Sequence, residues 1–346
     1  MIAFVLSGGG ARGALQIGAL RALLEANIQP SLLVGTSVGA VNAAYVALRG
    51  FDLDSLEGLS QAWEDAASAH LLPANGLRMM LSALLRHGGG DSYQRMRGFF
   101  IAHGLTPDLR FIDQRGARLL IVATDLNAGL PVLYGRDPQQ SVLEGVLAST
   151  AVPPWVLPIQ KDGQWLMDGG AVSNLPIEAA LKEGARKIIA LDLADHRCLP
   201  SGGGSLLEFV LKLAGTVQQR QSEMELALAA AHGVEVHRIA LQAEAPIPIW
   251  DFRHTEKLIA RGYRVTCDEI AHWRGGYQGR GHKWWSRLER SGFLPRLREI
   301  ASRRQKPANS TSASTRQLIP FSTSRVRNRA EFEPRYGSDV TSSRPC

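Results

Sequence analysis

Residues 5–40 read VLSGGGARGALQIGALRALLEANIQPSLLVGTSVGA and contain two glycine-rich turns, SGGGARG at 7–13 and GTSVG at 35–39. An apolar run precedes each turn, and residues compatible with a helix follow it. Between the turns, residues 14–27 carry apolar side chains at helical spacing. The stretch therefore predicts a strand, a turn and a helix in succession, formed twice.

Both turns have a use in acyl transfer. Ser37 lies between two glycines on a sharp strand-to-helix turn, which can expose its hydroxyl above a sheet. The run Gly8, Gly9 and Gly10 before a helix offers several backbone N–H groups. With the positive end of the helix dipole, these groups can hold the oxyanion that forms when an ester carbonyl is attacked. The two turns predict a nucleophile and an oxyanion hole.

The composition indicates a protein that can bury one large core. The chain has 346 residues, 45% of them hydrophobic. It has neither an apolar run of the roughly 18 uncharged residues that span a bilayer nor the pattern of a Sec signal peptide. The cysteines are few and widely spaced, which argues against a disulfide framework or a thiolate metal cluster. We therefore expect a cytoplasmic protein that can lie at the membrane periphery.

The net charge of +7 is concentrated near the C-terminal end. Residues 303–346 carry nine basic and three acidic side chains, so the first 302 residues are nearly neutral. The Ser, Thr, Arg and Pro content of residues 303–346 offers little apolar surface to bury, which predicts disorder. The basic composition therefore says little about an active site.

Strand and helix patterns alternate as far as residue 273. Beyond the first two strands, further strands are predicted at 118–124, 131–134, 155–159, 164–167, 187–193 and 235–241. Helices are predicted at 40–48, within 52–109, and at 141–148, 176–183 and 255–273. This alternation indicates an α/β three-layer domain with a largely parallel sheet.

Three local patterns make more detailed predictions. A hairpin turn at Asp162-Gly163 delivers Asp168 at the end of a strand. An apolar stripe over residues 77–85 predicts a helix. A long helix beginning at Ser205 is predicted to carry on one face Leu206, Val210, Leu213 and Val217.

The first turn also fits a dinucleotide-binding loop. Gly8, Gly10 and Gly13 satisfy G-x-G-x-x-G after a strand and before a helix. That fold needs an acidic residue at the end of its second strand to hold the ribose. Here the second strand, residues 32–34, runs into Gly-Thr-Ser with no carboxylate, which argues against a nucleotide site.

Two kinds of base can activate Ser37. A late histidine completes the triad of an α/β-hydrolase, and His254, His272 and His282 are available, although none lies in a pattern typical of a constrained loop. Asp168 ends a predicted strand, and two glycines follow it. A carboxylate accepts a serine proton usefully only where desolvation and positioning assist it. The residue types alone leave a Ser-His and a Ser-Asp esterase open.

Four sequence blocks resemble the patatin-like phospholipase family in the form common in bacteria. They are GGGARG at 8–13, GTSVGA at 35–40, ASTAVPP at 148–154, and DGG at 168–170 followed by NLP at 174–176. Their order and spacing are those of the family, and the resemblance extends over residues 1–273. It implies a three-layer α/β/α patatin-like domain with a largely parallel central sheet.

The resemblance also implies a catalytic dyad without histidine, in which Ser37 is the nucleophile and Asp168 the base. The oxyanion hole that it implies consists of Gly8, Gly9, Gly10 and Arg12. The expected reaction is hydrolysis of a lipid acyl ester, of phospholipase A or lysophospholipase type, through an acyl-enzyme. It requires no cofactor and no metal. Trp155 is bulkier than the family pattern at its position, and we expect it to narrow the acyl pocket.

The C-terminal part is predicted to divide in two beyond a hydrolase domain of residues 1–273. Residues 274–302 form a basic, aromatic extension, and 303–346 form the disordered tail. Trp284, Trp285 and the surrounding arginines are of the kinds favoured at a lipid interface. A single Arg-Gly patch is common in linkers and argues against nucleic acid. We expect a lipid substrate and peripheral membrane contact; a catalytically silent membrane-binding module is the remaining alternative.

Overall fold

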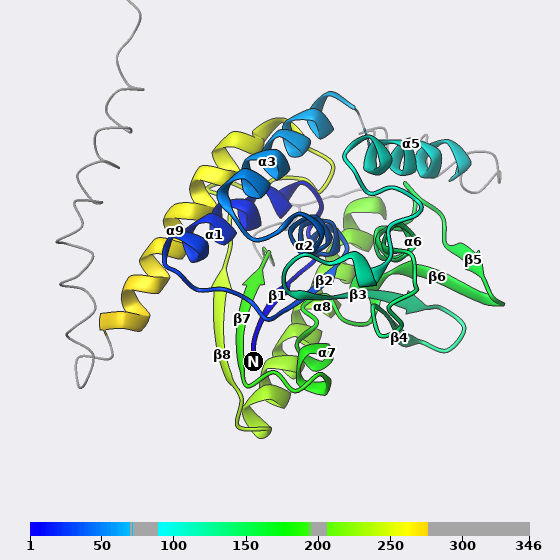
Figure 1. The fold of residues 1–346 in the computed structure, drawn as a ribbon. Helices are drawn as coiled ribbons and strands as arrows, with labels where there is room; N and C mark the ends of the chain where they lie inside the picture. The colour runs from blue at the N-terminus through cyan, green and yellow to red at the C-terminus, as the bar shows by residue number, and fades with distance from the viewer. Residues whose placement is uncertain (70, 72–88, 194, 196–205, 276–346) are drawn as a thin grey trace, which may run out of the picture. The chain divides into compact units, whose positions relative to one another are not determined.

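A mixed eight-stranded sheet forms the centre of the protein (Figure 1). The computed structural model describes residues 1–69, 71, 89–193, 195 and 206–275. The strands are β1 (Ile2–Leu6), β2 (Leu32–Thr36), β3 (Arg118–Asp125), β4 (Leu130–Tyr134), β5 (Ile159–Lys161), β6 (Gln164–Asp168), β7 (Lys187–Asp192) and β8 (Glu235–Ala240). Their order in the sheet is β5-β6-β3-β2-β1-β7-β8, and β4 pairs with β3.

The centre of the sheet is parallel. Strand β1 pairs in parallel with β2 and β7, and the parallel pairing continues from β2 to β3 and from β7 to β8. Strands β4 and β6 both run antiparallel to β3, and β5 pairs antiparallel with β6. The predicted fold class, an α/β domain with a largely parallel sheet, is confirmed.

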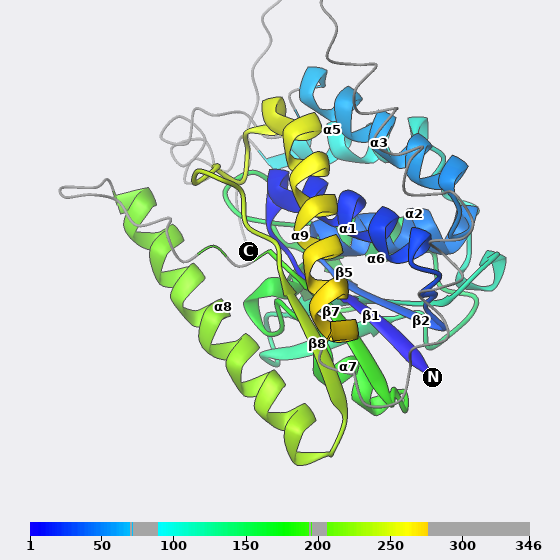
Figure 2. The same cartoon turned by 90° about the vertical axis from the view of Figure 1, so that its left-hand side faces the viewer.

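Helices cover both faces of this sheet. They are α1 (Ala14–Glu25), α2 (Val38–Arg49), α3 (Leu53–Ser68), α5 (Gly89–Ala102), α6 (Val142–Ser149), α7 (Ile177–Lys182), α8 (Leu206–Ala231) and α9 (Thr255–Gly275). Short 3-10 turns occur at η1 (Gly10–Gly13), η2 (Phe111–Asp113), η3 (Gly169–Ala171) and η4 (Phe252–His254). Helices α1, α2, α3 and α9 lie on one side of the sheet, and α7 and α8 lie on the other (Figures 1 and 2).

The alternation of side chains along the strands explains the two layers. In β1, Phe4 and Leu6 pack into the cluster beneath α1, α2 and α9, whereas Ala3 and Val5 pack into the cluster against α7 and α8. Successive residues of a strand point to opposite faces. Because both faces are covered, the central strands are mostly apolar, as expected for a buried parallel sheet.

Most of the predicted elements occur with small shifts at their ends. The hairpin turns at Asp162 and Gly163, both with positive φ, as predicted. Its first strand begins only at Ile159, because Trp155 leaves the sheet and packs on Trp250 with ring centroids 5.6 Å apart. The predicted stripe over residues 77–85 lies outside the described residues.

The long helix predicted from Ser205 is α8. Leu213 and Val217 share a face of this helix, and that face is exposed rather than packed. The side chains of Leu206 and Val210 lie outside the described part of the chain. Farther along α8, Ala229 packs against the sheet. Only the C-terminal half of α8 therefore contributes to the core among the described side chains.

The last described helix, α9, ends at Gly275, two residues beyond the predicted domain boundary at 273. The predicted extension at 274–302, apart from its first two residues, and the tail at 303–346 lie outside the described residues. Within the described ranges, no helix combines the length and apolar character needed to cross a bilayer.

Candidate active site

Ser37 lies at the sharp turn between β2 and α2. Its backbone angles, φ 55° and ψ −127°, fall in a region that residues with a side chain rarely adopt. The flanking glycines permit the turn: a Cβ on Gly35 would lie 2.5 Å from the Gly39 carbonyl oxygen, and a Cβ on Gly39 would lie 2.2 Å from that of Leu6. The GTSVG sequence thus places Ser37 at the carboxyl end of β2, where its side chain lines a pocket.

The pairing of β6 with β3 places Asp168 at the pocket that Ser37 lines. Thr36, which precedes Ser37, pairs with Val122, and Asp168 pairs with Ala123, the next residue of β3. Two segments that lie far apart in the sequence are therefore aligned on neighbouring residues of one strand. Strand β3 therefore aligns both the Ser37 turn and the Asp168 carboxylate.

The environment of Asp168 makes its carboxylate a stronger base than an exposed aspartate. The residue is buried, and its Oδ1 accepts a hydrogen bond from the Gly170 N–H at 2.7 Å. Burial raises the pKa of Asp168 to about 6; a hydrogen bond with the Ser37 side chain and the bond from the Gly170 N–H offset only part of that rise. Oδ2 is buried and makes no bond of ordinary geometry within the described residues. This oxygen can accept a proton from Ser37, since catalytic hydrogen bonds often tighten only when substrate is bound.

Ser149 supports the Ser37 turn through two hydrogen bonds. Its Oγ accepts a hydrogen bond from the Ser37 backbone N–H at 2.8 Å and donates to the Val122 carbonyl oxygen at 2.6 Å. Ser149 is fully buried at the end of α6. Ser149 was not predicted as a site residue, although it belongs to the ASTAVPP block. It ties the strained backbone of Ser37 to β3.

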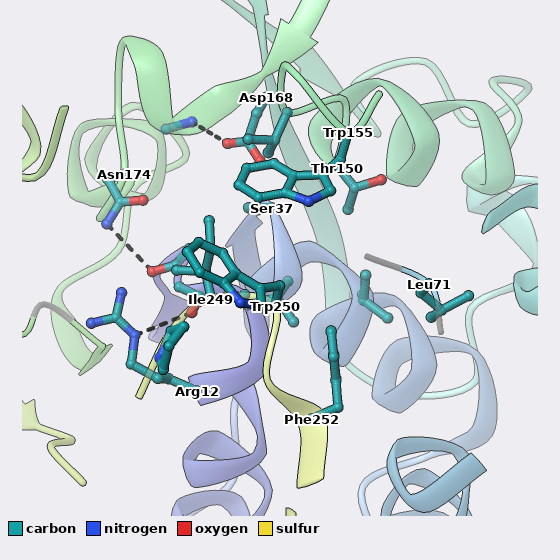
Figure 3. Close-up of a pocket in the computed structure, with 18 of the residues that line it drawn as sticks. Arg12, Ser37, Leu71, Thr150, Trp155, Asp168, Asn174, Ile249, Trp250 and Phe252 are labelled. Carbon is teal, nitrogen blue, oxygen red and sulfur yellow. Dashed lines mark hydrogen bonds between the residues drawn. The ribbon is translucent and has the colours of Figure 1, made fainter. Parts of the chain in front are cut away.

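The glycine loop before α1 lies against Ser37 and is held by Asn174 and Arg12 (Figure 3). The Gly8 N–H donates to the Asn174 carbonyl oxygen at 3.2 Å, and the Arg12 Nε donates to the Gly9 carbonyl oxygen at 3.2 Å. The N–H groups of Gly9 and Gly10 find no acceptor within the part of the chain that the structure describes. Of the predicted oxyanion donors, these two are available, while Gly8 is engaged and Arg12 positions the loop. Asn174 was not predicted as a site residue, although it follows the DGG block.

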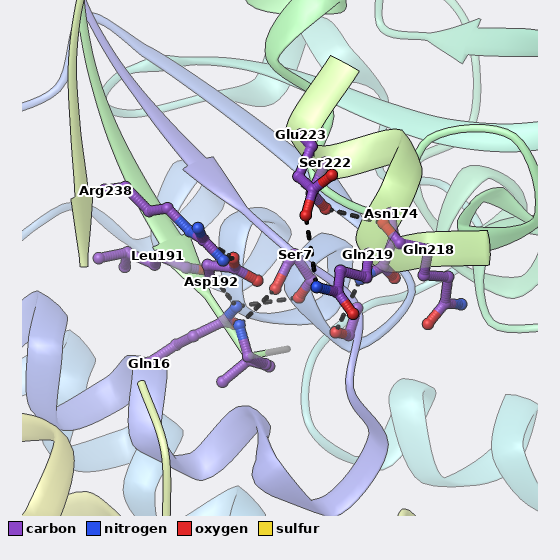
Figure 4. Close-up of polar contacts among 12 residues, drawn as sticks. Ser7, Gln16, Asn174, Leu191, Asp192, Gln218, Gln219, Ser222, Glu223 and Arg238 are labelled. Atoms are coloured by element: carbon purple, nitrogen blue, oxygen red, sulfur yellow. Dashed lines mark hydrogen bonds and ion pairs between the residues drawn. The ribbon is translucent and has the colours of Figure 1, made fainter. Parts of the chain in front are cut away.

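A buried polar network holds the glycine loop in place. The Gln16 Nε2 donates to the carbonyl oxygens of Ser7, at 2.9 Å, and Leu191, at 3.3 Å (Figure 4). The Asn42 Nδ2 donates to the Gln16 Oε1, and the Trp63 Nε1 donates to the Asn42 Oδ1, both at 2.9 Å. Buried polar groups in such a network are costly to leave unpaired. The network therefore fixes the loop relative to α2, the helix that begins after Ser37.

A pocket of about 850 Å³ contains Ser37 and Asp168 (Figure 3). Its volume is typical of small-molecule sites. Much of the wall is apolar and aromatic, and Trp155 is part of it. Other large side chains in the wall are Trp63, Met96, Phe100, Trp250 and Phe252. Such a wall can cover an acyl chain while its ester carbonyl lies at Ser37.

Of the histidines predicted as alternative bases, the two that the structure describes are not part of this wall. His254 and His272 lie outside it, and His282 lies outside the described residues. His103 does line the pocket, but one of its ring nitrogens is bonded to Asp65 at 3.0 Å. Within the described residues, a Ser-His arrangement at Ser37 finds no support.

Solved structures of two bacterial proteins align with this chain. VipD from Legionella pneumophila aligns with a TM-score of 0.41 and 14% identity over 78% of this chain and 66% of its own. ExoU from Pseudomonas aeruginosa, in complex with SpcU, aligns with a TM-score of 0.32 and 14% identity over 79% of this chain and 52% of its own.

Curated relatives cover a little over half of this chain. Patatin-like phospholipase domain-containing protein 6 from Homo sapiens is 31% identical over 210 residues, which is 59% of this chain and 14% of its own length. An uncharacterized NTE family protein from Mycobacterium tuberculosis is 29% identical over 218 residues, which is 63% of this chain and 34% of its own length. The chain thus spans only a minor part of these relatives.

The match to a family profile extends from the first strand to the helix that follows the Asp168 turn. The profile is that of the patatin-like phospholipases, and it matches residues 4–181, more than half of the chain. The matched range includes the glycine loop, the Ser37 turn, the Ser149 segment and Asp168. The chain belongs to the patatin-like phospholipase family.

Proposed function

We propose that this protein is a lipid acyl hydrolase of phospholipase A or lysophospholipase type, with Ser37 as nucleophile and Asp168 as base. The observation that carries the proposal is the buried carboxylate beside the strained Ser37 turn, at an apolar pocket of about 850 Å³. Membership of the patatin-like phospholipase family supports a lipid ester as the substrate. The reaction needs no cofactor and no metal.

The first half of the reaction forms an acyl-enzyme. Ser37 Oγ attacks the ester carbonyl carbon while its proton passes to Asp168 Oδ2. The negative oxygen of the tetrahedral intermediate is stabilised by the free N–H groups of Gly9 and Gly10, in a loop that Arg12 holds in place. The intermediate collapses when the carbon–oxygen bond to the alcohol breaks, and the leaving alcohol takes the proton from Asp168.

The second half releases the fatty acid. Asp168 accepts a proton from a water molecule, which attacks the acyl carbonyl at the same site. A second tetrahedral intermediate uses the same amide donors. It collapses by breaking the bond to Ser37 Oγ, which recovers the proton from Asp168. The products are a free fatty acid and the regenerated enzyme.

The active-site assignment is tested by fatty-acid release from a mixed lipid extract. The wild type is compared with Ser37→Ala and with Ser222→Ala, a control in which the lost hydroxyl bonds only to its own helix, at the Gln218 carbonyl oxygen. Mass spectrometry of the released acids and remaining lipids identifies the head group and the acyl position. We expect release by the wild type and Ser222→Ala only. Release by Ser37→Ala at the wild-type rate would remove Ser37 from the mechanism.

Membrane contact through Trp284, Trp285 and the basic tail is part of the same proposal. These residues lie outside the described ranges, so their sequence alone supports it. Replacing both tryptophans by alanine in the full chain should lower the fraction that floats with lipid vesicles. Unchanged flotation would remove these two residues from the contact.

A further inference from the structure

One side of α8 carries large apolar side chains that nothing in the described protein covers. Phe209 is 63% exposed, Leu213 54%, Val217 46% and Met224 59%. Their spacing of four, four and seven residues places them within about 80° of arc on one helix face. Residues 212–217 are exposed on all sides of the helix. The four apolar side chains therefore lie on one exposed face of the helix, which we call the α8 face.

The opposite side of α8, from Gln218 onward, is fixed beside the catalytic carboxylate. The Gln218 Nε2 donates to the Gly170 carbonyl oxygen at 3.3 Å, and the Gln221 Nε2 donates to that of Ala171 at 2.8 Å. Glu225 accepts hydrogen bonds from the Ser173 hydroxyl and from the Glu178 N–H. These contacts anchor α8 to the segment that follows Asp168, so the α8 face has a defined position relative to the active site.

The same helix also forms part of the pocket wall. Residues 212 and 214–219 of α8 line the pocket that contains Ser37. Phe209 and Leu213 belong to the α8 face without lining the pocket. The apolar face is thus continuous with the rim of the proposed acyl site. Figure 2 shows α8 along the flank of the domain, on the side of the sheet opposite α9.

The size and charge of the α8 face fit a lipid surface better than a second copy of the chain. The four side chains expose on the order of 400 Å² of apolar surface, about half of what one partner contributes to a stable protein interface. Arg220 lies on the same helical face between Val217 and Met224 and is 72% exposed. It is paired with Glu223 at 3.3 Å, and Lys212 lies at the edge of the face. Apolar side chains flanked by long cationic ones are typical of helices that lie in a bilayer interface, where the cations reach lipid phosphates.

We infer that the α8 face docks on a phospholipid surface and holds the rim of the Ser37 pocket at the membrane, so that a lipid acyl chain passes directly from the bilayer into the pocket. This inference rests on the proposed hydrolase function for its purpose, but the docking itself is a separate property. It assigns to α8 a role that is independent of the tryptophans at 284 and 285.

The test uses the full chain and a double substitution, Phe209→Glu with Leu213→Glu. The matched control is Ile112→Glu with Leu130→Glu, two apolar residues that are each 61% exposed and lie on η2 and β4. Binding to vesicles of phosphatidylcholine and phosphatidylglycerol is measured by flotation, with Ser37→Ala present in every protein to prevent hydrolysis. We expect the α8 substitutions to weaken vesicle partitioning about tenfold or more, and the control pair to change it less than about twofold.

Activity is measured separately, on proteins that retain Ser37. The α8 substitutions should lower hydrolysis of vesicle lipid in proportion to binding, while kcat/KM for a soluble short-chain ester stays within about twofold of the wild type. If no ester is hydrolysed by any form, the proposed function fails while the flotation result still stands. Equal flotation of the α8 and control variants would overturn the inference.

Two other occupants give distinct outcomes. If a second copy covers the α8 face, the wild type is a dimer by light scattering and the glutamate pair makes it monomeric. If another part of the chain covers the face, the glutamate pair speeds hydrogen exchange at residues 209–217 without vesicles, and vesicles do not slow that exchange in the wild type. Docking on lipid predicts that the wild type is a monomer. It also predicts that hydrogen exchange at residues 209–217 of the wild type slows only when vesicles are added. Either of the first two results would overturn the inference.

Discussion

The Ser149 hydroxyl accepts a hydrogen bond from the backbone N–H of Ser37 at 2.8 Å. Ser37 lies at the N-cap of α2 in a left-handed backbone conformation, so its N–H has no acceptor within the helix. Ser149 in turn donates to the Val122 carbonyl oxygen. One buried hydroxyl therefore holds the strained nucleophile turn on the strand that also aligns Asp168.

Ser149→Ala should impair catalysis more than it impairs substrate binding. Without the hydroxyl, the Ser37 N–H loses its acceptor and the turn can relax away from its strained geometry. We expect kcat for a soluble ester to fall about 10- to 100-fold, with a change in KM of less than about threefold. Ser222→Ala, which also removes a buried serine hydroxyl, should leave kcat near the wild-type value. Similar kcat values for both variants would show that Ser149 does not position Ser37.

Activity should follow the ionisation of Asp168. The base must be deprotonated, and burial raises the pKa of Asp168 to about 6. Activity is therefore lost as the pH falls through about 6 and reaches a plateau above it. The measurement is kcat/KM for a soluble ester between about pH 4 and pH 9, which reports the ionisation of the free enzyme. A profile that is flat down to pH 4.5, far below that pKa, would contradict Asp168 as the base.

Asp168→Asn should stabilise the fold at alkaline pH while it abolishes activity. The pKa of Asp168 rises from 3.8 to about 6 on folding, so the folded protein binds more protons than the unfolded chain between these values. Stability is therefore lost as the pH rises through this window, by up to about 3 kcal/mol above pH 6. The neutral amide avoids this cost. Urea unfolding should show a larger free energy of unfolding for the variant than for the wild type at pH 8, and a smaller difference at pH 4. Equal free energies of unfolding at pH 8 would contradict the burial cost assigned to Asp168.

Gly10→Ala should distort the glycine loop more than the backbone strain of an alanine with positive φ would do by itself. Gly10 has φ 58°, and a Cβ there would lie 2.4 Å from the Ile249 carbonyl oxygen. Gly233 has φ 66° with nothing within 4 Å of such a Cβ, so Gly233→Ala carries the backbone strain without the clash. We expect Gly10→Ala to lower kcat more than about tenfold and Gly233→Ala to leave it unchanged. Equal effects would place Gly10 outside the catalytic loop.

The elements that form the site were predictable because their signals are local. Gly35 and Gly39 allow the close approach of backbone atoms that a sharp turn requires. The Asp162-Gly163 pair favours a tight hairpin. The pairing of Ser37 with Asp168 is not a local signal, and only the resemblance to the patatin-like phospholipases predicts it. The turn signals depend on a few neighbouring residues and can therefore be recognised in the sequence.

The supporting contacts could not be predicted because they depend on register and on burial. The sequence does not specify that Asp168 pairs with Ala123, one residue beyond the partner of Thr36. The bond from the Ser37 N–H to Ser149 follows from that three-dimensional arrangement, as does the engagement of Gly8 with Asn174. Helical periodicity likewise placed Leu213 on one face of α8 without showing that the face is exposed.

The most direct test of the Ser37–Asp168 dyad is the rate of fatty-acid release from a soluble ester by the wild type, Ser37→Ala, Asp168→Asn and the double variant. Residues that act as one unit show non-additive losses. We expect each single variant to lose about 10⁴-fold or more in kcat and the double variant to be no slower than either. A double variant whose loss equals the product of two independent losses, or a Ser37→Ala protein that keeps a tenth of wild-type activity, would contradict the dyad.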